Sequence, residues 1–423
     1  MRAIRWVVAA VVLGGGTVTG GNWPGWRGPN GDGVAPAPRP QPFPGGPPMS
    51  WGPEEVRWRQ KLPGPGNSSP VVWGERVFVT CAEEKGKRRG TLCFGRDDGK
   101  LLWERWVPFA GKEPTHQTNP YCSATPVTDG ERLIVSHGSA GIFCYDLSGK
   151  LLWETPVGTY THIWGNASSP VLDGDHVYQH MGPGLLVKMF CLDKRSGKIV
   201  WEKRLKGAEA KEEGQFFGSW ATPVLLERGG KRDLVLPLPG RLVGFEARTG
   251  EEAWWCEGLT DLCYVDAHVG KEAIVAMSGF RGAALGMRRP GPGDSGDLTA
   301  THRVWQVKRN QQRIGSGVIA GGRLYMPNEP GVVQAIDIKT GEEVWKGKPG
   351  GAIWSSAILA HGRIHIVDRT GVTHVLAPGD EFKKLGEGRV TGEVERTHAT
   401  PAIIDGEIYV RTWEALYRVG KGK

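Results

Sequence analysis

The chain of 423 residues lacks the motifs that mark several common enzyme and metal-binding classes. None of its seven cysteines stands in a CxxC motif, so zinc or thioredoxin-type sites of that kind are not expected. Glycine-rich stretches such as 182–184 and 291–293 lack the Lys-Ser/Thr ending of a phosphate-binding loop, and no Gly-x-Ser-x-Gly elbow occurs. His361 and His365 stand four apart in a predicted turn and strand, not on one helix face. No metal site is therefore predicted.

Long apolar runs and blocks of one charge are also scarce. Beyond the N-terminus, no segment approaches the ~18 apolar residues that a membrane-spanning helix needs. The 53 basic and 45 acidic residues give a net charge of +8, and the basic ones are scattered apart from a short run at 85–89. This pattern favours a solvated surface over a nucleic-acid groove, so no nucleic-acid partner is expected.

Glycine, proline and tryptophan are in excess. The 64 glycines and 30 prolines interrupt long helices and indicate many turns, while 39% hydrophobic residues suffice for a core. The 18 tryptophans are far above ordinary usage and call for one structural rule that places many of them.

The first 21 residues have the order of a secretory signal. A short basic start (residues 1–5) precedes an apolar run (6–13) and a small-residue stretch (14–21). We predict a signal peptide at 1–21 and a secreted or periplasmic protein, with an uncleaved interfacial anchor as the alternative. No cysteine follows the apolar run, so a lipoprotein anchor is not indicated.

Two cysteine patterns bear on an oxidising compartment. Cys93, Cys144 and Cys191 fall at one repeat position, described below, and are interpreted as small buried hydrophobic residues. Cys256 and Cys263 could pair in such a compartment, and their pairing stays open at this point.

Two markers repeat along the chain and define its units. The pattern Gly-x-x-x-Trp recurs roughly every 40 to 50 residues, a blade-sized period. The aromatic position is held by Trp58, Trp103, Trp153, Trp201, Trp254, Trp305 and Trp345, and in a degenerate copy by Phe382. Each aromatic is preceded by a small-hydroxyl-Pro triplet opening an apolar strand: 68–70, 124–126, 168–170, 221–223 and 399–401, with weaker copies at 315–317 and 355–357.

Four short antiparallel strands per repeated unit predict an all-β, eight-bladed β-propeller. The repeated tryptophan is expected between neighbouring blades. Residues 55–62 resemble a fourth strand without its first three, and residues 401–419 three strands without a fourth, so joining them would complete the eighth blade and leave no sheet edge at the seam. The alternative is a seven-bladed ring with an irregular copy at 352–382. The predicted parts are a Pro/Gly-rich strap (22–54) and one propeller domain (55–420) with blades near 63–107, 121–157, 165–206, 218–258, 262–308, 313–348, 352–386 and 397–419.

The units resemble the tryptophan-docked repeats of pyrroloquinoline-quinone-like (PQQ-like) propellers, a superfamily that includes BamB and quinoprotein dehydrogenases. The chain is similar over nearly all of 22–420 to secreted PQQ-binding-like propeller proteins of planctomycetes and related bacteria. The matching stretches are Trp23–Gly33, Tyr121–Val127, Ser278–Gly282, Pro327–Gly331 and Arg411–Trp413. This resemblance implies the fold much more than an activity.

Candidate ligand residues are expected on the loop-rich face, which carries the links between blades and the turns between second and third strands. Residues just before each first strand should lie nearest the axis. Aromatic rings and guanidinium groups there would suit a flat anionic ligand or a carbohydrate, although ordinary packing and turn roles are the competing interpretation. The candidates are Tyr121, Trp164, Trp220, Tyr264, Arg281, Arg313, Asn328, Glu329, Trp354, Asp368, His398 and Arg411.

The predicted function is non-catalytic binding of a partner protein, an envelope polymer or a small ligand by a monomer, with no cofactor expected. The alternative is a PQQ- and calcium-dependent alcohol or sugar dehydrogenase. The resemblance implies that such an enzyme would need stacking on both faces of the quinone, Arg or Lys partners, calcium ligands such as Asn328 and Glu329, and a base such as Asp266 or Asp368. The adjacent cysteine pair of many such enzymes is missing.

Overall fold

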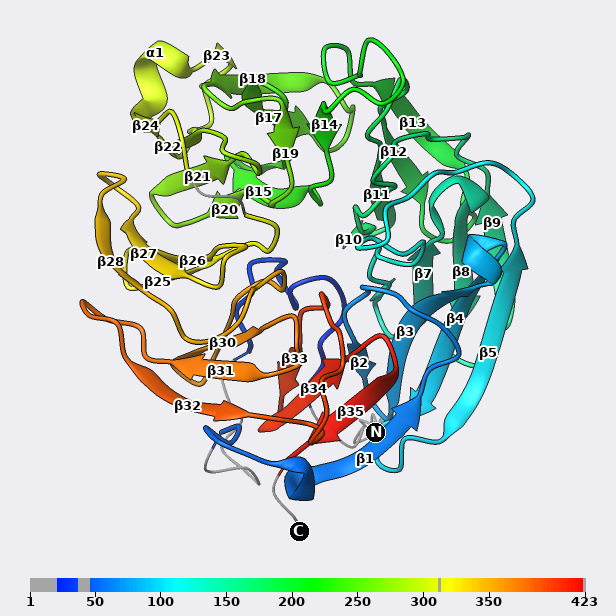
Figure 1. The fold of residues 1–423 in the computed structure, drawn as a ribbon. Coiled ribbons are helices and arrows are strands. Elements are labelled where there is room, and N and C mark those ends of the chain that lie inside the picture. The colour runs from blue at the N-terminus through cyan, green and yellow to red at the C-terminus, as the bar shows by residue number, and fades with distance from the viewer. Residues whose placement is uncertain (1–20, 37–45, 311–312, 421–423) are drawn as a thin grey trace, which may run out of the picture.

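The computed structural model describes residues 21–36, 46–310 and 313–420, and these form eight sheets arranged as a ring (Figure 1). Each blade has four antiparallel strands, which follow sequence order except in the last blade, and the sheet of the fourth blade carries one further short strand at its edge. Residues 1–20 of the predicted signal peptide lie outside the described ranges. No helix among the described residues is long and apolar enough to cross a bilayer.

The first four blades follow one another along the chain. Blade 1 comprises β2 (Val71–Trp73), β3 (Arg76–Glu83), β4 (Arg88–Gly95) and β5 (Leu101–Pro108); blade 2 comprises β6 (Val127–Thr128), β7 (Arg132–Ser136), β8 (Ile142–Asp146) and β9 (Leu151–Thr155). Blade 3 comprises β10 (Val171–Asp173), β11 (His176–Met181), β12 (Lys188–Asp193) and β13 (Ile199–Arg204); blade 4 comprises β15 (Val224–Arg228), β16 (Lys231–Leu238), β17 (Arg241–Glu246) and β18 (Glu252–Glu257).

The last four blades complete the ring. Blade 5 comprises β20 (His268–Val269), β21 (Ala273–Met277), β22 (Ala284–Arg288) and β24 (Arg303–Val307); blade 6 comprises β25 (Val318–Ala320), β26 (Arg323–Pro327), β27 (Val333–Asp337) and β28 (Glu343–Gly347). Blade 7 comprises β29 (Ile358–Ala360), β30 (Arg363–Val367), β31 (Thr373–Leu376) and β32 (Lys384–Gly388); blade 8 comprises β33 (Ala402–Ile404), β34 (Glu407–Arg411), β35 (Ala415–Val419) and β1 (Val56–Lys61). Outside the blades, β14 (Gly218–Ser219) pairs with β19 (Leu262–Cys263), β23 (Gly296–Asp297) pairs with the edge of β18, and α1 (Thr299–His302) precedes β24.

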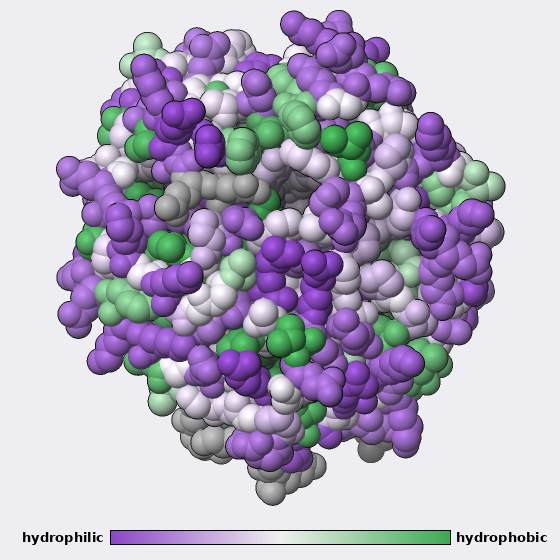
Figure 2. All heavy atoms as spheres, viewed as in Figure 1, coloured by the Kyte–Doolittle hydropathy of each residue, from purple (hydrophilic) through white to green (hydrophobic). Residues whose placement is uncertain are grey.

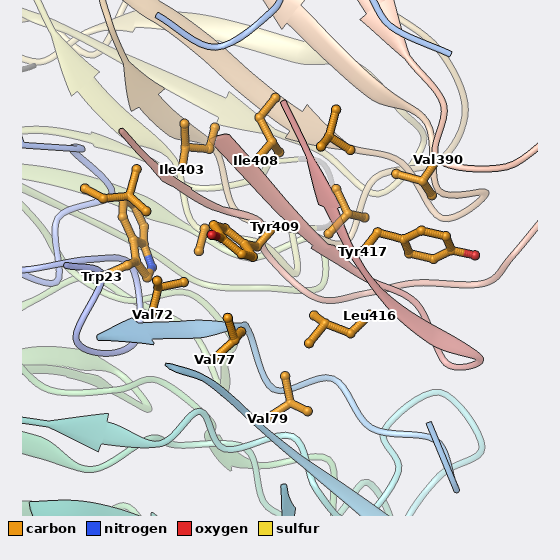
Figure 3. Packing of buried hydrophobic residues seen from close by; sticks show 14 of the residues in the cluster. Trp23, Val72, Val77, Val79, Val390, Ile403, Ile408, Tyr409, Leu416 and Tyr417 are labelled. Atoms are coloured by element: carbon orange, nitrogen blue, oxygen red, sulfur yellow. The ribbon is translucent and has the colours of Figure 1, made fainter. Parts of the chain in front are cut away.

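The predicted closure is confirmed, and the seven-bladed alternative is excluded. Strand β1 pairs antiparallel with β35, with Trp58 opposite Arg418. The Trp58 ring lies 6.3 Å from that of Tyr409 in β34. Figure 3 shows Tyr409, Ile403 and Ile408 of blade 8 packed in one cluster with Val72 and Val77 of blade 1. The segment 352–382, which the alternative treated as irregular, supplies most of a full seventh blade.

The repeated tryptophans contact the next blade around the ring. The Trp103 indole N–H donates to the Leu147 carbonyl of blade 2 at 3.0 Å, and Trp153 donates to Lys194 of blade 3 at 2.9 Å. The same bond is made by Trp58, Trp201, Trp305 and Trp345. Beneath Trp103 lies Gly149 at φ +85°, where a Cβ would approach the indole to 2.6 Å, so the turn needs glycine. One aromatic therefore fills the junction of each of these blade pairs.

Two junctions depart from this rule. Trp254 donates to the Asp233 carboxylate of its own blade at 2.8 Å, and it is fully buried between blades 4 and 5. The prediction for Phe382 is wrong: Gly386 occupies the repeat position opposite Val375, while Phe382 precedes β32 and packs against Trp345 at 5.6 Å.

The strap supplies the aromatic residue that blade 7 lacks. Trp51 pairs with Gly388 and is 7% exposed, and a Cβ on Gly388 would lie 1.9 Å from its indole. Glycine at this position therefore lets the indole lie directly against the backbone of β32. Trp51 belongs to the same cluster as residues of blades 7, 8 and 1.

A chain of seven hydrogen bonds runs around the axis and ties blade 1 through to blade 8. At the first strands of blades 2 to 8, the middle residue of the triplet accepts a hydrogen bond from the backbone N–H of the equivalent residue in the preceding blade. The bonds are 2.8–3.0 Å long and join Ser69, Thr125, Ser169, Thr222, Asp266, Ser316, Ser356 and Thr400 in that order. The triplet hydroxyls thus have a structural role, and Asp266 replaces the hydroxyl in blade 5.

The N-terminal strap crosses the axis of the ring. Trp23 pairs with Val72 of blade 1, and Val34 pairs with Leu359 of blade 7. Between them, the Trp26 indole donates to Asp266 at 2.7 Å, and the buried Arg27 lies 3.6 Å from the same carboxylate and donates to the Gly317 carbonyl. The strap therefore covers one end of the central channel, anchored at the single charged member of the ring.

All seven cysteines are buried and free. The suggested Cys256–Cys263 pair is therefore not formed, because each thiol donates to a nearby backbone carbonyl instead, Cys256 to Glu257 and Cys263 to Thr260. Cys93, Cys144 and Cys191 lie opposite a docked tryptophan in the neighbouring strand, as small buried residues.

We predict that Trp58→Ala destabilises the closed ring by about 3–5 kcal/mol, because it removes a buried indole at the seam between the two ends of the chain. Arg57→Ala, an exposed change in the same strand, is the control and should shift stability by less than about 0.5 kcal/mol. Denaturant unfolding followed by tryptophan fluorescence and circular dichroism measures both. Equal stability of the two variants would contradict the closure role of Trp58.

Five buried histidines predict acid sensitivity. Burial lowers the pKa of His137, His268 and His365 to about 3 and that of His180 and His398 to about 4. The unfolded chain, with histidine pKa near 6.5, binds protons that the folded chain does not, so stability should fall as the pH drops from 6.5 towards 4. Melting temperatures at pH 7.5, 6, 5 and 4 test this, and His365→Leu should flatten the dependence. A melting temperature independent of pH over that range would refute it.

Candidate functional site

A cavity of about 420 Å³ lies on the axis of the propeller. The ring residues Ser169, Ser316 and Ser356 and the strap residue Trp26 contribute to its lining, which places it above the strap. Its volume is within the range of small-ligand sites, about 300–1,000 Å³. Figure 2 shows the face turned to the viewer in Figure 1, with a hollow near its middle.

One wall of the cavity is a cluster of aromatic rings from the links before blades 3, 4 and 5. Trp164 lies 5.6 Å from Trp220 and 6.0 Å from Tyr264, and Trp220 lies 5.2 Å from Tyr264. The Trp220 indole donates to the Gly165 carbonyl at 2.9 Å, which fixes its orientation. Phe216, more than half exposed, extends the cluster outward at 5.0 Å from Trp164.

A second aromatic wall comes from the links before blades 7 and 8. Trp354 and His398 line the cavity with their rings 4.5 Å apart. The Arg369 guanidinium lies 4.6 Å from the centroid of the Trp354 ring. Burial lowers the pKa of His398 to about 4, and its Nδ1 lies 2.9 Å from the Thr118 carbonyl. His398 is therefore a neutral imidazole at neutral pH.

Polar groups of the lining are mainly uncharged. The ring hydroxyls of Ser169, Ser316 and Ser356 each accept a backbone N–H, so their own hydrogens remain to be donated. Asn119 donates to the Trp164 and Asn166 carbonyls, which holds the first-to-second blade link against the next one. The carboxylate of Asp266 is satisfied by Trp26, Thr222 and the ion pair with Arg27. Among the residues that the structure describes, no arginine or lysine lines this cavity.

The structure brings five of the twelve predicted site residues together around this cavity. These are Trp164, Trp220, Tyr264, Trp354 and His398, all from the links between blades. Glu329 reaches its edge, with one carboxylate oxygen 3.5 Å from the Trp354 indole nitrogen. The expectation that the residues before each first strand lie near the axis thus matches their placement.

Tyr121 and the predicted arginines lie elsewhere. Tyr121 packs 5.0 Å from the guanidinium of the buried Arg89, and Arg281 is exposed beside Phe280. Arg411 is buried and donates to Ser68 of blade 1, so it spans the closure junction. Burial lowers the pKa of Arg313 and Arg411 to about 10. Arg313 and Arg411 are therefore buried with partners inside the protein, and none of the three predicted arginines is among the lining residues of the axial cavity.

The four residues considered for calcium and base roles, Asn328, Glu329, Asp266 and Asp368, each have separate hydrogen-bond partners. The Asn328 amide donates to Gln334 at 3.1 Å, whereas Asp368 is bound within its own turn and by His374 at 3.0 Å. Burial alone would raise the pKa of Asp368, but hydrogen bonds from His374 and Thr370 lower it to about 2. No group of three or more His, Cys, Asp or Glu residues able to hold a metal ion occurs within the described ranges.

Sequence reasoning missed several residues of the site. Trp26 was assigned to an extended strap, and the triplet hydroxyls were interpreted only as strand openers. Asp266 was considered only as a base, although aligning 265–267 with the other triplets would have shown a carboxylate at the hydroxyl position. Asn67, Asn119 and Ser123 carry no repeat signal.

Comparison with solved structures supports the propeller architecture. BamB from Moraxella catarrhalis matches with a TM-score of 0.60 at 15% identity, covering 87% of this chain and 98% of that one. Quinohemoprotein alcohol dehydrogenase from Comamonas testosteroni matches with a TM-score of 0.63 at 11% identity, covering 95% and 81%. At such low identities these similarities concern the fold.

Sequence comparison gives one short relative and one family. A tetrathionate hydrolase from Acidithiobacillus ferrooxidans is 30% identical over 120 residues, which are 28% of this chain and only 21% of that protein. The family model PQQ_2, described as outer membrane protein assembly factor BamB, matches residues 51–187, 88–257 and 295–385. These matches together span more than half of the chain, which therefore belongs to this BamB-like family of PQQ-repeat propellers.

Proposed function

We propose that this protein is a secreted or periplasmic, non-catalytic binding propeller whose axial cavity takes an uncharged carbohydrate. The location is supported by the signal-like N-terminus and by the outer-membrane description of its family. The carrying observation is the cavity itself: two aromatic walls, hydroxyl donors between them, and, in the described part of the chain, no arginine or lysine in the lining.

Aromatic walls and hydroxyl donors suit a sugar ring. The C–H faces of a pyranose are apolar and stack on indole rings, while its hydroxyl groups accept and donate hydrogen bonds. Trp164 and Trp220 on one side and Trp354 on the other supply such faces. The rings are held by backbone hydrogen bonds and neighbouring aromatics, so little ordering is needed on binding.

The charge of the cavity disfavours an anionic ligand. Within the described ranges, the buried charged group of the lining is Asp266, which is negative and already paired with Arg27, and His398 is neutral. A carboxylate entering the cavity would lose its hydration without gaining a cationic partner. The flat anionic ligand considered from the sequence is therefore less favoured than an uncharged carbohydrate.

The residues present do not fit PQQ and calcium. The three carboxylates of PQQ need cationic partners, but none of the described residues that line the axial cavity is an arginine or lysine. Asn328 and Asp368 are each engaged in separate local hydrogen bonds, so they form no shared oxygen cage with Glu329. These residues therefore favour a binding protein over a PQQ-dependent dehydrogenase.

The first test measures carbohydrate binding directly. Isothermal titration and tryptophan fluorescence with uncharged oligomers of glucose, mannose, xylose and N-acetylglucosamine should detect at least one ligand, with galacturonate oligomers binding more weakly. Trp354→Ala should weaken that binding tenfold or more, about 1.4 kcal/mol. Trp255→Leu, on the outer strand of blade 4, is the aromatic control and should bind normally. Binding of none of these sugars, or preference for the galacturonates, would overturn the proposal.

The second test addresses catalysis. Purified protein incubated with PQQ and Ca²⁺ should show neither dye-linked alcohol or aldose oxidation nor an increase in melting temperature, because the lining lacks cationic partners for the quinone. Turnover that disappears in Glu329→Ala would establish the dehydrogenase instead.

A further inference from the structure

A second hollow lies beside the axial cavity, between blade 1, blade 8 and the link that joins blades 1 and 2. Its volume is about 680 Å³. We call it the outer groove; it is lined by Pro63, Gly64, Pro65, residues 82–86, Thr115, His116, Gln117, Pro120, Tyr121 and Trp413. Tyr121 was a predicted ligand residue and Trp413 was not, and neither lines the axial cavity.

The outer groove and the axial cavity share a wall. His116 lines both, and the segment 115–121 of the link supplies residues to each side. A row of rings also joins them: Trp354 lies 4.5 Å from His398, and His398 lies 5.5 Å from Trp413. Trp354 and His398 line the axial cavity and Trp413 lines the groove, so aromatic surface runs from one hollow to the other.

The two aromatic residues of the groove are held in place. The Trp413 indole donates to Asn67 Oδ1 at 2.9 Å, and the Arg396 guanidinium lies 4.7 Å from its ring. Tyr121 lies against Gly86, where a Cβ would approach its ring to 2.3 Å, and beside the buried Arg89. Both rings are therefore fixed platforms, which lowers the entropy lost when a ligand stacks on them.

The acidic residues at the groove are already paired. Arg88 lies 2.6 Å from Glu83 and 3.9 Å from Glu84. Lys85 is the cationic side chain of the described lining, and the rest is mostly proline, glycine, aromatic and neutral polar, as in the axial cavity. An uncharged, oxygen-rich chain with apolar ring faces therefore meets a compatible surface along the whole path.

From this continuity we infer that the ligand is a polysaccharide whose end occupies the axial cavity and whose following units cross the 115–121 link into the outer groove. This inference rests on the proposed function, since it extends the carbohydrate site of the axial cavity. The inference also gives the bound polysaccharide a direction. Its end lies at the axis, where the strap closes the channel, and its further units leave the protein at blade 1.

The test is a length series of uncharged β-1,4-linked glucose and N-acetylglucosamine oligomers, from two to six units, titrated against the full protein. Affinity should rise at least tenfold from the dimer to the hexamer. Trp413→Ala and Tyr121→Ala should each reduce that ratio to about twofold, with folding verified by circular dichroism. Phe280→Ala, an exposed aromatic beside Arg281 on another blade, is the matched control and should keep the full ratio.

The outcomes separate this inference from the proposed function. Dimer binding that does not strengthen with length, or a ratio unchanged in both groove variants, overturns the polymer inference and leaves the axial site standing. Failure of every oligomer to bind overturns both. A proline-rich peptide whose binding requires Trp413 and Tyr121, but not Trp354, would show that the groove serves a protein instead and would also overturn the inference.

Discussion

The structure depends on two kinds of contact between neighbouring blades. An indole packs at the outer strand, and a hydrogen bond joins the inner strands. A four-stranded blade has two faces to bury and cannot do so alone, so its stability comes from the blade on either side. The indole fills the wide outer part of each junction, where blades diverge. Near the axis the sheets are too close for a large side chain, and a hydroxyl accepting the neighbour's backbone N–H satisfies a polar group that would otherwise be buried without a partner.

The same inner ring connects the fold to the site. In blade 5 the ring position is Asp266, which still accepts the Thr222 N–H as a hydroxyl would, but has a second oxygen to spare. That oxygen holds Trp26 and faces Arg27, so the strap is fastened across the channel at this one place. The channel thereby becomes a cavity closed at one end. The carboxylate that replaces a hydroxyl in this one repeat therefore has three effects. It bonds blade 4 to blade 5, holds the strap in place and sets the polarity of the cavity floor.

Much of the ring could be predicted because it repeats. Each copy of Gly-x-x-x-Trp indicates the same packing between blades. The single strand at 55–62 and the three strands at 401–419 together predicted the closure through Trp58. Features that occur once were not predictable in this way. Trp51 substitutes for a missing blade residue from a segment far away in sequence, and only the three-dimensional path of the strap shows that it lies against Gly388. Phe382 was misplaced because periodicity alone cannot detect a shift of four residues in a degenerate copy.

The site was predicted only in part for a related reason. Position around the axis follows from the order of strands, so the link aromatics Trp164, Trp220, Tyr264, Trp354 and His398 could be grouped in advance. Whether an arginine faces the axis depends on its tertiary contacts. Arg411 donates to Ser68 at the junction of blades 8 and 1, and Arg27 of the strap pairs with Asp266. Similarity of the tryptophan-docked repeats to those of known propellers indicates how the blades pack. The choice of ligand depends instead on the charges of the side chains that line the axial cavity. In this propeller the buried cations are used by the scaffold itself, and what remains for a ligand is aromatic surface and hydroxyl groups.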